Sequence, residues 1–359
     1  SSRKTPRPCP TAAPPASHRP ASARTPPPAA GMGQAVATTR FLWYGKKHFT
    51  QTGWKAHSAG YKPGVLEAAD MRGRVAVVTG ANSGVGREVA QYLAGIGGTV
   101  YMVCRNAEKA HKERDAIAEA TGSQSVHVLV GDCGVSSDVR RVAAEVRQRE
   151  GSVHCLVCNA GALENHRQTT REGHEVTFAT HLLCGTYTLT EELLPLLQKA
   201  EGSRVVVVSS GGMLNVKYDH DLATGAKGSY NGQLAYAYAK RGQVLMCEHW
   251  SKDPGAPVTF VSCHPGWSDT PGVDHAYGSM KRFLQPMRSK WEGAEGICWL
   301  CVAPQQELES GAFYLDRQPQ VKHLVPWTRG EPGEAQALAK RLAELVASTS
   351  ASAGTSAGA

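Results

Sequence analysis

The chain has 359 residues, of which 41% are hydrophobic and 19% charged, a composition typical of a globular protein with a large core. Its net charge of +8 originates near the N-terminus, because no Asp or Glu precedes Glu67 whereas ten of the 39 Lys and Arg residues do. The other 29 basic residues are matched by 31 acidic ones, which argues against a nucleic-acid-binding domain, since such a domain carries its positive charge on the folded body.

The N-terminal residues 1–39 are predicted to be a disordered leader. The Pro/Ala/Ser/Arg-rich stretch over 1–31 has almost no bulky apolar residues to offset the entropy of ordering. Its lack of acidic residues also resembles an organellar transit peptide, and both interpretations stay open. A myristoylation signal at Met32-Gly33 is rejected because Ala37 stands where that motif needs Ser or Thr. We expect a cytoplasmic protein, with import into an organelle as the alternative.

An aromatic and basic lead-in over 40–72 follows, with the sequence "RFLWYGKKHFTQTGW". It is expected to form a short helix that docks on the domain; contact with a membrane surface is the alternative. The whole sequence contains no run of 18 apolar residues, so no membrane-spanning helix is predicted.

Strand-like and helix-like segments alternate between residues 73 and 265. The expected strands are "RVAVVTG" (74–80), "TVYMVCR" (99–105), "VHVLVGD" (126–132), "HCLVCNAG" (154–161), "RVVVVSS" (204–210) and "VTFVSCHPG" (258–266). Helices are expected at 86–97, 106–120, 135–150, 175–198 and 236–252. Continuous apolar strands separated by helices predict an α/β fold with a doubly wound parallel sheet, in three α/β/α layers. This Rossmann fold is expected as a single domain over 73–330, followed by a C-terminal helix and low-complexity tail over 331–359.

Ten cysteines include two C-x-x-C pairs, Cys155 with Cys158 and Cys298 with Cys301. Residues three apart on a strand point to opposite faces, which argues against the first pair as a metal site. The second pair lies in a helix-like apolar run. Buried free thiols in a reducing compartment, with no metal, are therefore expected.

The stretch "TGANSGVG" over 79–86 directly follows the first expected strand. In a doubly wound sheet this turn binds the pyrophosphate of a dinucleotide at a helix N-terminus. Gly80 permits the turn, Gly84 allows close approach of the cofactor, and Gly86 lets the helix pack on the sheet. Ser83 and Val85 complete the predicted cofactor-binding turn.

The spacing T-G-x-x-x-G-x-G resembles the short-chain dehydrogenase/reductase family, and the family's later motifs follow in order between residues 40 and 330. The resemblance implies that Asp132 contacts the adenine ring, that Asn159, Ala160 and Gly161 ("NAG") lie beside the cofactor, and that the Pro265-Gly266 turn frames the nicotinamide. The stretches "SSGGML" and "HPGWSDTPG", together with the aromatic lead-in, are most similar to one subgroup of this family.

The catalytic residues expected from these motifs are Ser210, Tyr236 and Lys240. Tyr236 and Lys240 are four residues apart on an expected helix and share a face. An ammonium group near a tyrosine stabilises the phenolate, so it brings proton exchange closer to neutral pH. Ser210 can donate a hydrogen bond to the substrate oxygen, and the resemblance implies that Lys240 also holds the nicotinamide ribose.

Cofactor choice is predicted from the end of the second strand, where a carboxylate would repel a 2′-phosphate. Arg105 stands there in "VCRN" and can bind that phosphate, with Ser83 assisting. NADP(H) is therefore preferred to NAD(H).

Two departures from the family pattern complicate this prediction. His181 in "FATHLL" stands where the family usually has an Asn that holds a relay water; it is either part of the relay or a packed helix histidine. The 26-residue step from Ser210 to Tyr236 exceeds the usual spacing, and its polar, Gly-rich insert is placed to line the substrate entrance.

The sequence thus predicts an NADP(H)-dependent oxidoreductase acting on a small-molecule carbonyl or alcohol, lipophilic or aromatic by family resemblance. The alternatives are a cofactor-binding protein with weak or lost catalysis, and a membrane-surface protein acting through its aromatic lead-in. A sugar-nucleotide epimerase is disfavoured, since that branch uses T-G-x-x-G-x-x-G. Substrate, direction of reaction, and a monomeric or homodimeric state are left open.

Overall fold

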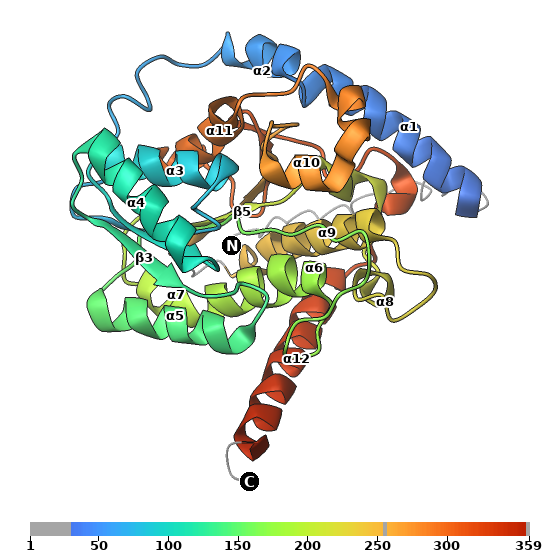
Figure 1. Cartoon of the computed structure of the whole chain (residues 1–359). Coiled ribbons are helices and arrows are strands. Elements are labelled where there is room, and N and C mark those ends of the chain that lie inside the picture. The colour runs from blue at the N-terminus through green and yellow to red at the C-terminus, as the bar shows by residue number, and fades with distance from the viewer. Residues whose placement is uncertain (1–29, 254–256, 357–359) are drawn as a thin grey trace, which may run out of the picture.

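A computed structural model describes residues 30–253 and 257–356 of the chain, and the predicted leader therefore lies mostly outside the described residues. Eight strands form one sheet in the order β3-β2-β1-β4-β5-β6-β7-β8 (Figure 1). The first seven are parallel to their neighbours, and only β8 runs antiparallel. Their bounds are β1 Val75–Thr79, β2 Thr99–Cys104, β3 Val126–Val130, β4 Cys155–Cys158, β5 Arg204–Val208, β6 Thr259–Cys263, β7 Phe313–Leu315 and β8 Gln318–Pro319.

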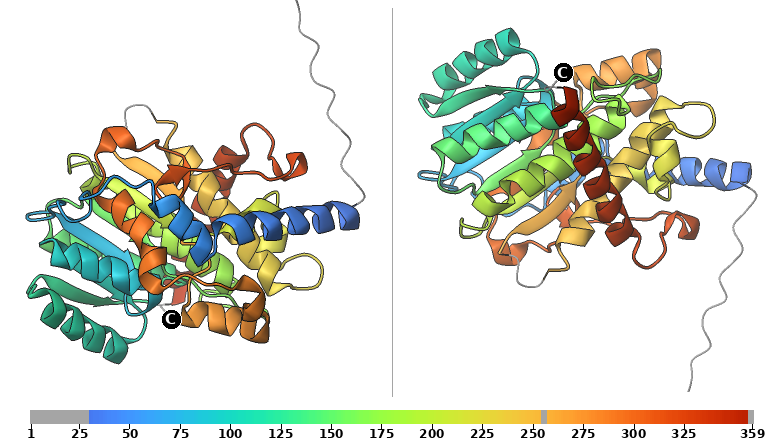
Figure 2. Two further views of the ribbon diagram at one scale, coloured as in Figure 1. Left: turned by 90° about the horizontal axis from the view of Figure 1, so that it is seen from above. Right: turned by 90° about the horizontal axis from the view of Figure 1, so that it is seen from below.

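Helices cover both faces of this sheet. One face carries α3 (Gly84–Gly95), α4 (Ala107–Thr121) and α11 (Lys290–Val302). The other carries α5 (Ser136–Arg149), α6 (Val176–Phe178), η1 (Ala179–Thr188), α7 (Leu189–Leu197), α9 (Gly232–Trp250) and α12 (Glu334–Ser356). Figure 2 shows the same layers from two further directions. The predicted doubly wound, three-layer α/β domain is confirmed.

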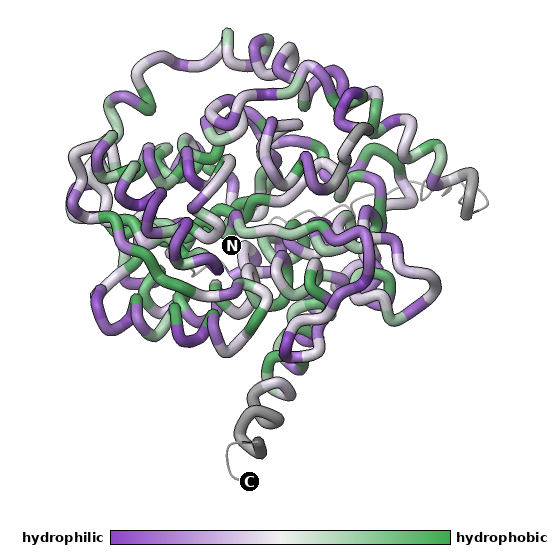
Figure 3. The backbone as a smooth tube through the Cα atoms, viewed as in Figure 1, coloured by the Kyte–Doolittle hydropathy of each residue, from purple (hydrophilic) through white to green (hydrophobic). Residues whose placement is uncertain are grey.

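Two hydrophobic cores lie on the two faces of the sheet, which explains why its strands are apolar throughout. In β4, Cys155 and Val157 belong to one core and Leu156 and Cys158 to the other. Figure 3 shows the strands as largely hydrophobic tube, whereas the outer turns of the helices are mostly hydrophilic. The alternation of faces within β4 also separates its two cysteines, as expected from their spacing.

The N-terminal segment docks on the domain through α1 (Ala30–His48) and α2 (Gln51–Ser58), shown in blue in Figures 1 and 2. Gly45 and Ala37 are buried on the inner side of α1. The boundary expected at residue 39 lies inside α1, because the helix continues upstream of the aromatic lead-in. The small residues at the start of α1 carry no hydrophobic pattern that would mark a helix in the sequence.

Four of the shorter elements follow β5 or β6, at the end of the sheet where the parallel strands finish: η2 (Gly211–Asn215), α8 (His220–Ala223), α10 (Pro271–Tyr277) and η3 (Gly278–Leu284). The other two are η4 (Gln305–Glu307), which precedes β7, and η5 (Pro326–Thr328), which follows β8. The insert expected as a polar loop contains η2 and α8, with Met213, Leu214 and Ala223 buried. It is thus folded onto the domain. The helix α12 likewise continues to Ser356, through most of the expected tail.

Candidate active site

The glycine turn between β1 and α3 has the backbone geometry that close approach of a phosphate requires. Gly80 and Gly84 have φ values of +64° and +55°, which residues with a Cβ rarely adopt. A Cβ at Gly86 would lie 2.3 Å from the Nδ2 of Asn159 and 2.6 Å from the carbonyl oxygen of Gly80. The glycines therefore keep a cradle at the α3 N-terminus that any larger residue would fill. This is the place where a dinucleotide pyrophosphate fits.

Ser83 and Val85 lie at the same helix terminus. Ser83 is the N-cap residue of α3, and its side chain makes no capping hydrogen bond. Val85 is in the first turn, and its side chain is buried in the core. The Ser83 hydroxyl and the backbone N–H groups at this terminus can therefore donate hydrogen bonds to a phosphate.

Thr79, at the end of β1, joins this turn to the "NAG" motif after β4. Its hydroxyl accepts hydrogen bonds from the backbone N–H groups of Asn159 and Ala160, each at 2.9 Å. The Asn159 amide donates in return to the Thr79 carbonyl oxygen, also at 2.9 Å. Because β1 and β4 are neighbours at the point where the strand order reverses, these bonds shape the cleft expected to receive the cofactor. Sequence reasoning missed Thr79, although it begins the T-G motif.

Arg105 and Asp132 lie at the ends of β2 and β3. The Arg105 side chain is 77% exposed and its Nη1 lies 3.8 Å from the Oδ2 of Asp132. The other oxygen of Asp132 accepts a hydrogen bond from the Gly134 N–H at 2.8 Å, which orients the carboxylate. An exposed guanidinium at this edge can bind a phosphate without having to leave a buried partner.

Ser210 and Tyr236 border the same space after β5. A Cβ at Gly212 would lie 3.6 Å from the Ser210 Oγ and 4.0 Å from the Cε1 of Tyr236. The Ser210 Oγ accepts a hydrogen bond from the Gly212 N–H at 3.2 Å, which leaves its own proton able to point elsewhere. The structure therefore brings the two predicted catalytic hydroxyl-bearing residues together.

Lys240 is fully buried one helical turn beyond Tyr236. Its Nζ lies 5.5 Å from the centroid of the Tyr236 ring and donates a hydrogen bond to the Val208 carbonyl oxygen at 2.7 Å. Burial lowers the pKa of Lys240 to about 7, only partly offset by the sulfur atoms of Cys263 and Cys158. The Ser209 hydroxyl donates to the Lys240 carbonyl oxygen at 2.8 Å, which ties α9 to the end of β5.

His181 lies in the π-helix η1, buried against Tyr236 with the ring centroids 5.2 Å apart. Its Nε2 lies 2.8 Å from the oxygen and 3.1 Å from the nitrogen of Ala162, so either tautomer bonds the backbone of that residue. Burial, followed by the charge of Lys240, lowers the pKa of His181 well below its ordinary value, which keeps the ring neutral. A Cβ at Gly161 would lie 2.3 Å from the His181 Cε1, so the glycine of "NAG" makes room for this ring.

The carbonyl oxygen of His181 is also engaged. It accepts hydrogen bonds from the Thr186 hydroxyl at 2.6 Å and from the Gln243 amide at 2.8 Å. Both of its acceptor positions are therefore satisfied within the protein. The ring Nδ1, in contrast, has no hydrogen-bond partner among the described residues, so the relay residue and the packed histidine both stay predictions.

The Pro265-Gly266 turn follows β6 and faces the glycine turn through Thr270. Gly266 has a φ of +73°. Thr270 caps α10, and its Cγ2 would lie 3.3 Å from a Cβ placed at Gly84. Thr270 thus closes one side of the cofactor cleft. Sequence reasoning missed it, although a Thr-Pro pair is a recognisable helix start.

Neither a metal site nor a disulfide is found among the residues that the structure describes. All nine described cysteines are free and buried, and no group of three or more metal-binding side chains occurs there. Over the same residues, the helices are too short or too polar to cross a bilayer.

A sequence model of the short chain dehydrogenase family matches residues 74–279. A dehydrogenase/reductase SDR family member 12 from Bos taurus is 36% identical over 309 residues, which cover 84% of this chain and 96% of that protein. The human protein of the same name is 35% identical over the same length. This is the subgroup that "SSGGML", "HPGWSDTPG" and the lead-in resemble.

More distant relatives extend the likeness. Human retinol dehydrogenase 11 is 35% identical over 251 residues, covering 68% of this chain and 77% of that protein. The crystal structure of an uncharacterised protein from Mycobacterium paratuberculosis superposes with a TM-score of 0.60 at 26% identity, over 78% of this chain and 97% of the other.

Proposed function

The chain belongs to the short chain dehydrogenase family, and from this premise we propose that it is an NADP(H)-dependent oxidoreductase of a carbonyl or alcohol substrate. The observation that carries the proposal is the assembly of Ser210, Tyr236 and Lys240 beside a glycine turn built for a dinucleotide. Bound nicotinamide would supply or accept the hydride. The side chains on α9 and after β5 would then bind the substrate oxygen and exchange a proton with it.

Tyr236 is proposed to exchange the proton with the substrate oxygen while Ser210 donates a hydrogen bond to that oxygen. The separation of 5.5 Å between the Lys240 Nζ and the Tyr236 ring centroid puts the ammonium in range to stabilise a phenolate. Because burial lowers the pKa of Lys240 to about 7, part of the lysine can lose its proton near neutral pH. In its ammonium form Lys240 would stabilise the Tyr236 phenolate and hold the cofactor ribose, and its neutral form could take up a proton during the reaction.

The preference for NADP(H) rests on Arg105. Its guanidinium is largely exposed and lies at the end of β2, where the adenosine ribose is held in this fold. The Asp132 Oδ2 lies 3.8 Å from the Arg105 Nη1, so the two groups attract each other without a close hydrogen bond. The guanidinium thus stays near that edge and can still bind a phosphate. An arginine there favours a 2′-phosphate over a free hydroxyl.

We propose that His181 shapes the site by packing and that it takes no part in proton transfer. Its ring fixes Ala162 and lies edge-on to Tyr236. A neutral ring whose carbonyl oxygen already accepts two hydrogen bonds suits this role. In this proposal the chain catalyses the reaction with a histidine at a position where the family usually has an asparagine.

A lipophilic or aromatic substrate is supported by a named relative, retinol dehydrogenase 11, whose name states a lipophilic alcohol as that protein's substrate. The insert between Ser210 and Tyr236 is anchored near the opening of the site. Its Tyr230 hydroxyl donates to the buried Glu175 at 2.9 Å, which ties the insert to α6. An insert held in this way can set the shape of the substrate entrance.

The reaction can be tested with a panel of lipophilic and aromatic carbonyls plus NADPH, and of the matching alcohols plus NADP. We expect turnover of at least one class, and loss of that turnover in Ser210→Ala with cofactor binding retained. Cofactor binding by a wild-type chain that turns over no compound of either panel would instead support the alternative of a cofactor-binding protein with lost catalysis.

A membrane-surface role has one specific observation in its favour. On α1 Trp43 is 71% exposed, Leu42 is 46% exposed, and the basic Lys46 and Lys47 follow. Flotation with anionic liposomes, comparing the full chain with Trp43→Ala, tests this role separately from turnover. Equal recovery of both proteins in the soluble fraction would rule it out.

A further inference from the structure

The junction between α1 and α2 reaches the active site, although it lies outside the residues that the family model matches. Phe49 occupies this junction and is 1% exposed. Its ring packs edge-on against His264 at a centroid distance of 4.2 Å, and a Cβ at Gly211 would lie 2.4 Å from its Cε2. Gly211 directly follows Ser210, and His264 directly precedes Pro265.

We propose that Phe49 is a positioning residue of the active site. Its ring lies between the turn that carries Ser210 and the turn that carries Pro265 and Gly266, and it sets the distance between them. Ser210 would donate a hydrogen bond to the substrate oxygen, whereas the Pro265-Gly266 turn would border the nicotinamide. The distance between the two turns would therefore determine whether one carbonyl group can accept the hydride at its carbon and the hydrogen bond at its oxygen. The catalytic part of this inference rests on the proposed function.

The backbone of Phe49 holds the same loop after β6. Its carbonyl oxygen accepts a hydrogen bond from the Trp267 N–H at 2.8 Å and another from the Arg288 Nε at 3.0 Å. The Trp267 ring also packs edge-on against the Phe49 ring, at 5.8 Å between centroids. Ring and carbonyl oxygen together therefore fix Phe49 to the loop in one orientation.

A buried ion pair secures this contact. Arg288 and Asp316 form a bidentate pair, with Nη1–Oδ1 and Nη2–Oδ2 distances of 2.5 and 2.7 Å, and their side chains are 1% and 3% exposed. The Arg288 Nη2 also donates to the His48 carbonyl oxygen at 2.7 Å, and the His57 Nδ1 lies 2.7 Å from the Asp316 carboxylate. Both helices of the N-terminal segment are thus bonded to the pair.

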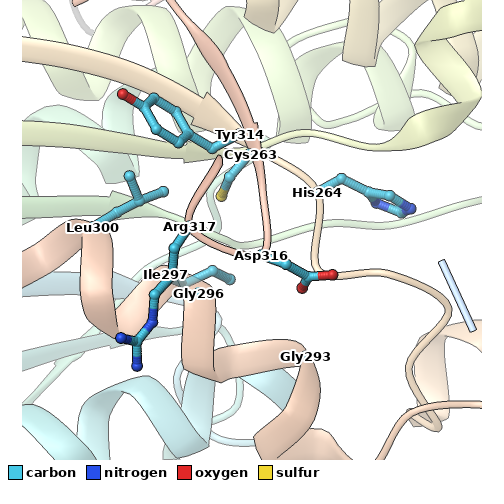
Figure 4. Close-up of a pocket in the computed structure, with 9 residues that line it drawn as sticks. All are labelled: Cys263, His264, Gly293, Gly296, Ile297, Leu300, Tyr314, Asp316 and Arg317. Carbon is cyan, nitrogen blue, oxygen red and sulfur yellow. The ribbon is translucent and has the colours of Figure 1, made fainter. Parts of the chain in front are cut away.

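The same arginine supports the Pro265-Gly266 turn. A Cβ at Gly266 would lie 2.2 Å from the Arg288 Nε, so only glycine lets the guanidinium lie against the turn. Beside this contact is a cavity of about 10 Å³, room for one water molecule, which is lined by His264 and Asp316 among others. In Figure 4 these two side chains point to the same side, away from Tyr314.

His264 contributes a packing surface to this arrangement. Neither of its ring nitrogens has a hydrogen-bond partner among the described residues. Burial, and then the charge of Arg288, lower the pKa of His264 to about 3, so the ring stays neutral against Phe49. The Ser209 N–H donates to the Cys263 carbonyl oxygen at 2.8 Å, which joins the ends of the two strands, and the rings of Phe49 and His264 pack against Gly211 by shape beyond that bond.

Hydrogen–deuterium exchange and kinetics on Phe49→Ala, Phe49→Leu and wild type test the proposal, with the exposed Trp43→Ala on the same segment as control. In Phe49→Ala we expect faster exchange over 211–215 and 265–268 and unchanged exchange over 79–86. Turnover should fall at least about tenfold, with NADPH affinity and substrate KM within about threefold. Phe49→Leu should recover part of both effects and Trp43→Ala should show neither.

Unchanged exchange in the two turns in Phe49→Leu and Phe49→Ala, or a loss of turnover no larger than the loss of folded protein, would overturn the proposal. If Phe49→Ala does not fold, the exchange rates of the two turns in Phe49→Leu, compared with wild type, still test the proposal. Wild-type chain inactive on every substrate would contradict the proposed reaction, whereas faster exchange in these turns would still support the positioning by Phe49.

Discussion

The regions proposed to bind the cofactor and the substrate, here the cofactor half and the substrate half of the site, are built in different ways. The proposed cofactor half consists of the short turns after β1, β2, β3 and β4, in which positive φ values at Gly80 and Gly84 and the hydrogen bonds of Thr79 and Asp132 fix the backbone. Each turn depends on residues next to it in the chain or on the neighbouring strand. The cofactor half can therefore be recognised in the sequence from short local motifs.

The substrate half is assembled from segments far apart in the chain. Ser210 and Tyr236 lie beside each other, yet the turn that carries Ser210 packs on Phe49, and Arg288 bonds a backbone oxygen 239 residues away. Contacts of this kind leave no short motif. The comparison suggests that the cofactor half tolerates only changes that keep its backbone geometry, whereas the substrate half depends on side-chain packing across the fold.

The largest expected effect separates chemistry from cofactor binding. Tyr236→Phe removes the phenolic hydroxyl and keeps the ring beside His181, so NADPH should bind as in wild type. Turnover should fall about 10²–10⁴-fold, the contribution of a positioned proton donor. Steady-state kinetics with NADPH titration by fluorescence measure both. A variant with most of the wild-type turnover would show that another group moves the proton.

The second effect is the pH dependence of stability that buried Lys240 introduces. Its pKa is about 7 in the folded chain and near 10.5 when unfolded, so between these values the unfolded chain binds more protons. The penalty for burying the charge is complete below pH 7 and disappears as pH rises towards 10.5. Stability of wild type relative to Lys240→Met should therefore increase with pH in this window.

Urea unfolding without cofactor, at pH 6 and pH 9.5, measures this difference. The advantage of Lys240→Met over wild type should shrink by on the order of 2–3 kcal/mol between the two pH values. The exposed Lys112→Met is the matched control and should show no such trend. A constant difference between Lys240→Met and wild type would mean that Lys240 keeps an ordinary pKa.

The third effect tests whether the cofactor half selects NADPH. Arg105→Asp replaces an exposed cation by an anion at the predicted 2′-phosphate position, which should weaken NADPH binding by about 1.5–3 kcal/mol. NADH binding should stay the same or improve. Lys112→Asp makes the same change in charge at an exposed position in α4 and should affect both cofactors little. Equal weakening of NADPH and NADH by Arg105→Asp would remove Arg105 from phosphate recognition.

The smallest effect is expected at His181. Asparagine in its place leaves the backbone carbonyl oxygen bonded to Thr186 and Gln243, so turnover should change by less than about threefold. The melting temperature should fall, because the ring packed against Gly161 and Tyr236 is lost. A gain in turnover of tenfold or more in His181→Asn would instead support the alternative of weakened catalysis in wild type.

Much of the molecule could be predicted from the sequence because its determinants are local. The alternation of apolar strands and helices predicted the doubly wound sheet, and the fold confirms it. The T-G-x-x-x-G-x-G spacing placed the glycine turn, and four-residue spacing put Tyr236 and Lys240 on one helix face. Local backbone sterics and helix periodicity are short-range properties, which a sequence displays directly.

The tertiary structure alone decided what joins distant segments. No local pattern marks Phe49 as the neighbour of Gly211, or Arg288 as the support of Gly266, because the two members of each pair lie far apart in the chain. The contacts of His181, with its ring against Ala162 and its carbonyl oxygen bonded to Thr186, likewise leave no trace in the sequence. Packing and buried hydrogen bonds depend on which surfaces meet, and only the folded chain brings those surfaces together.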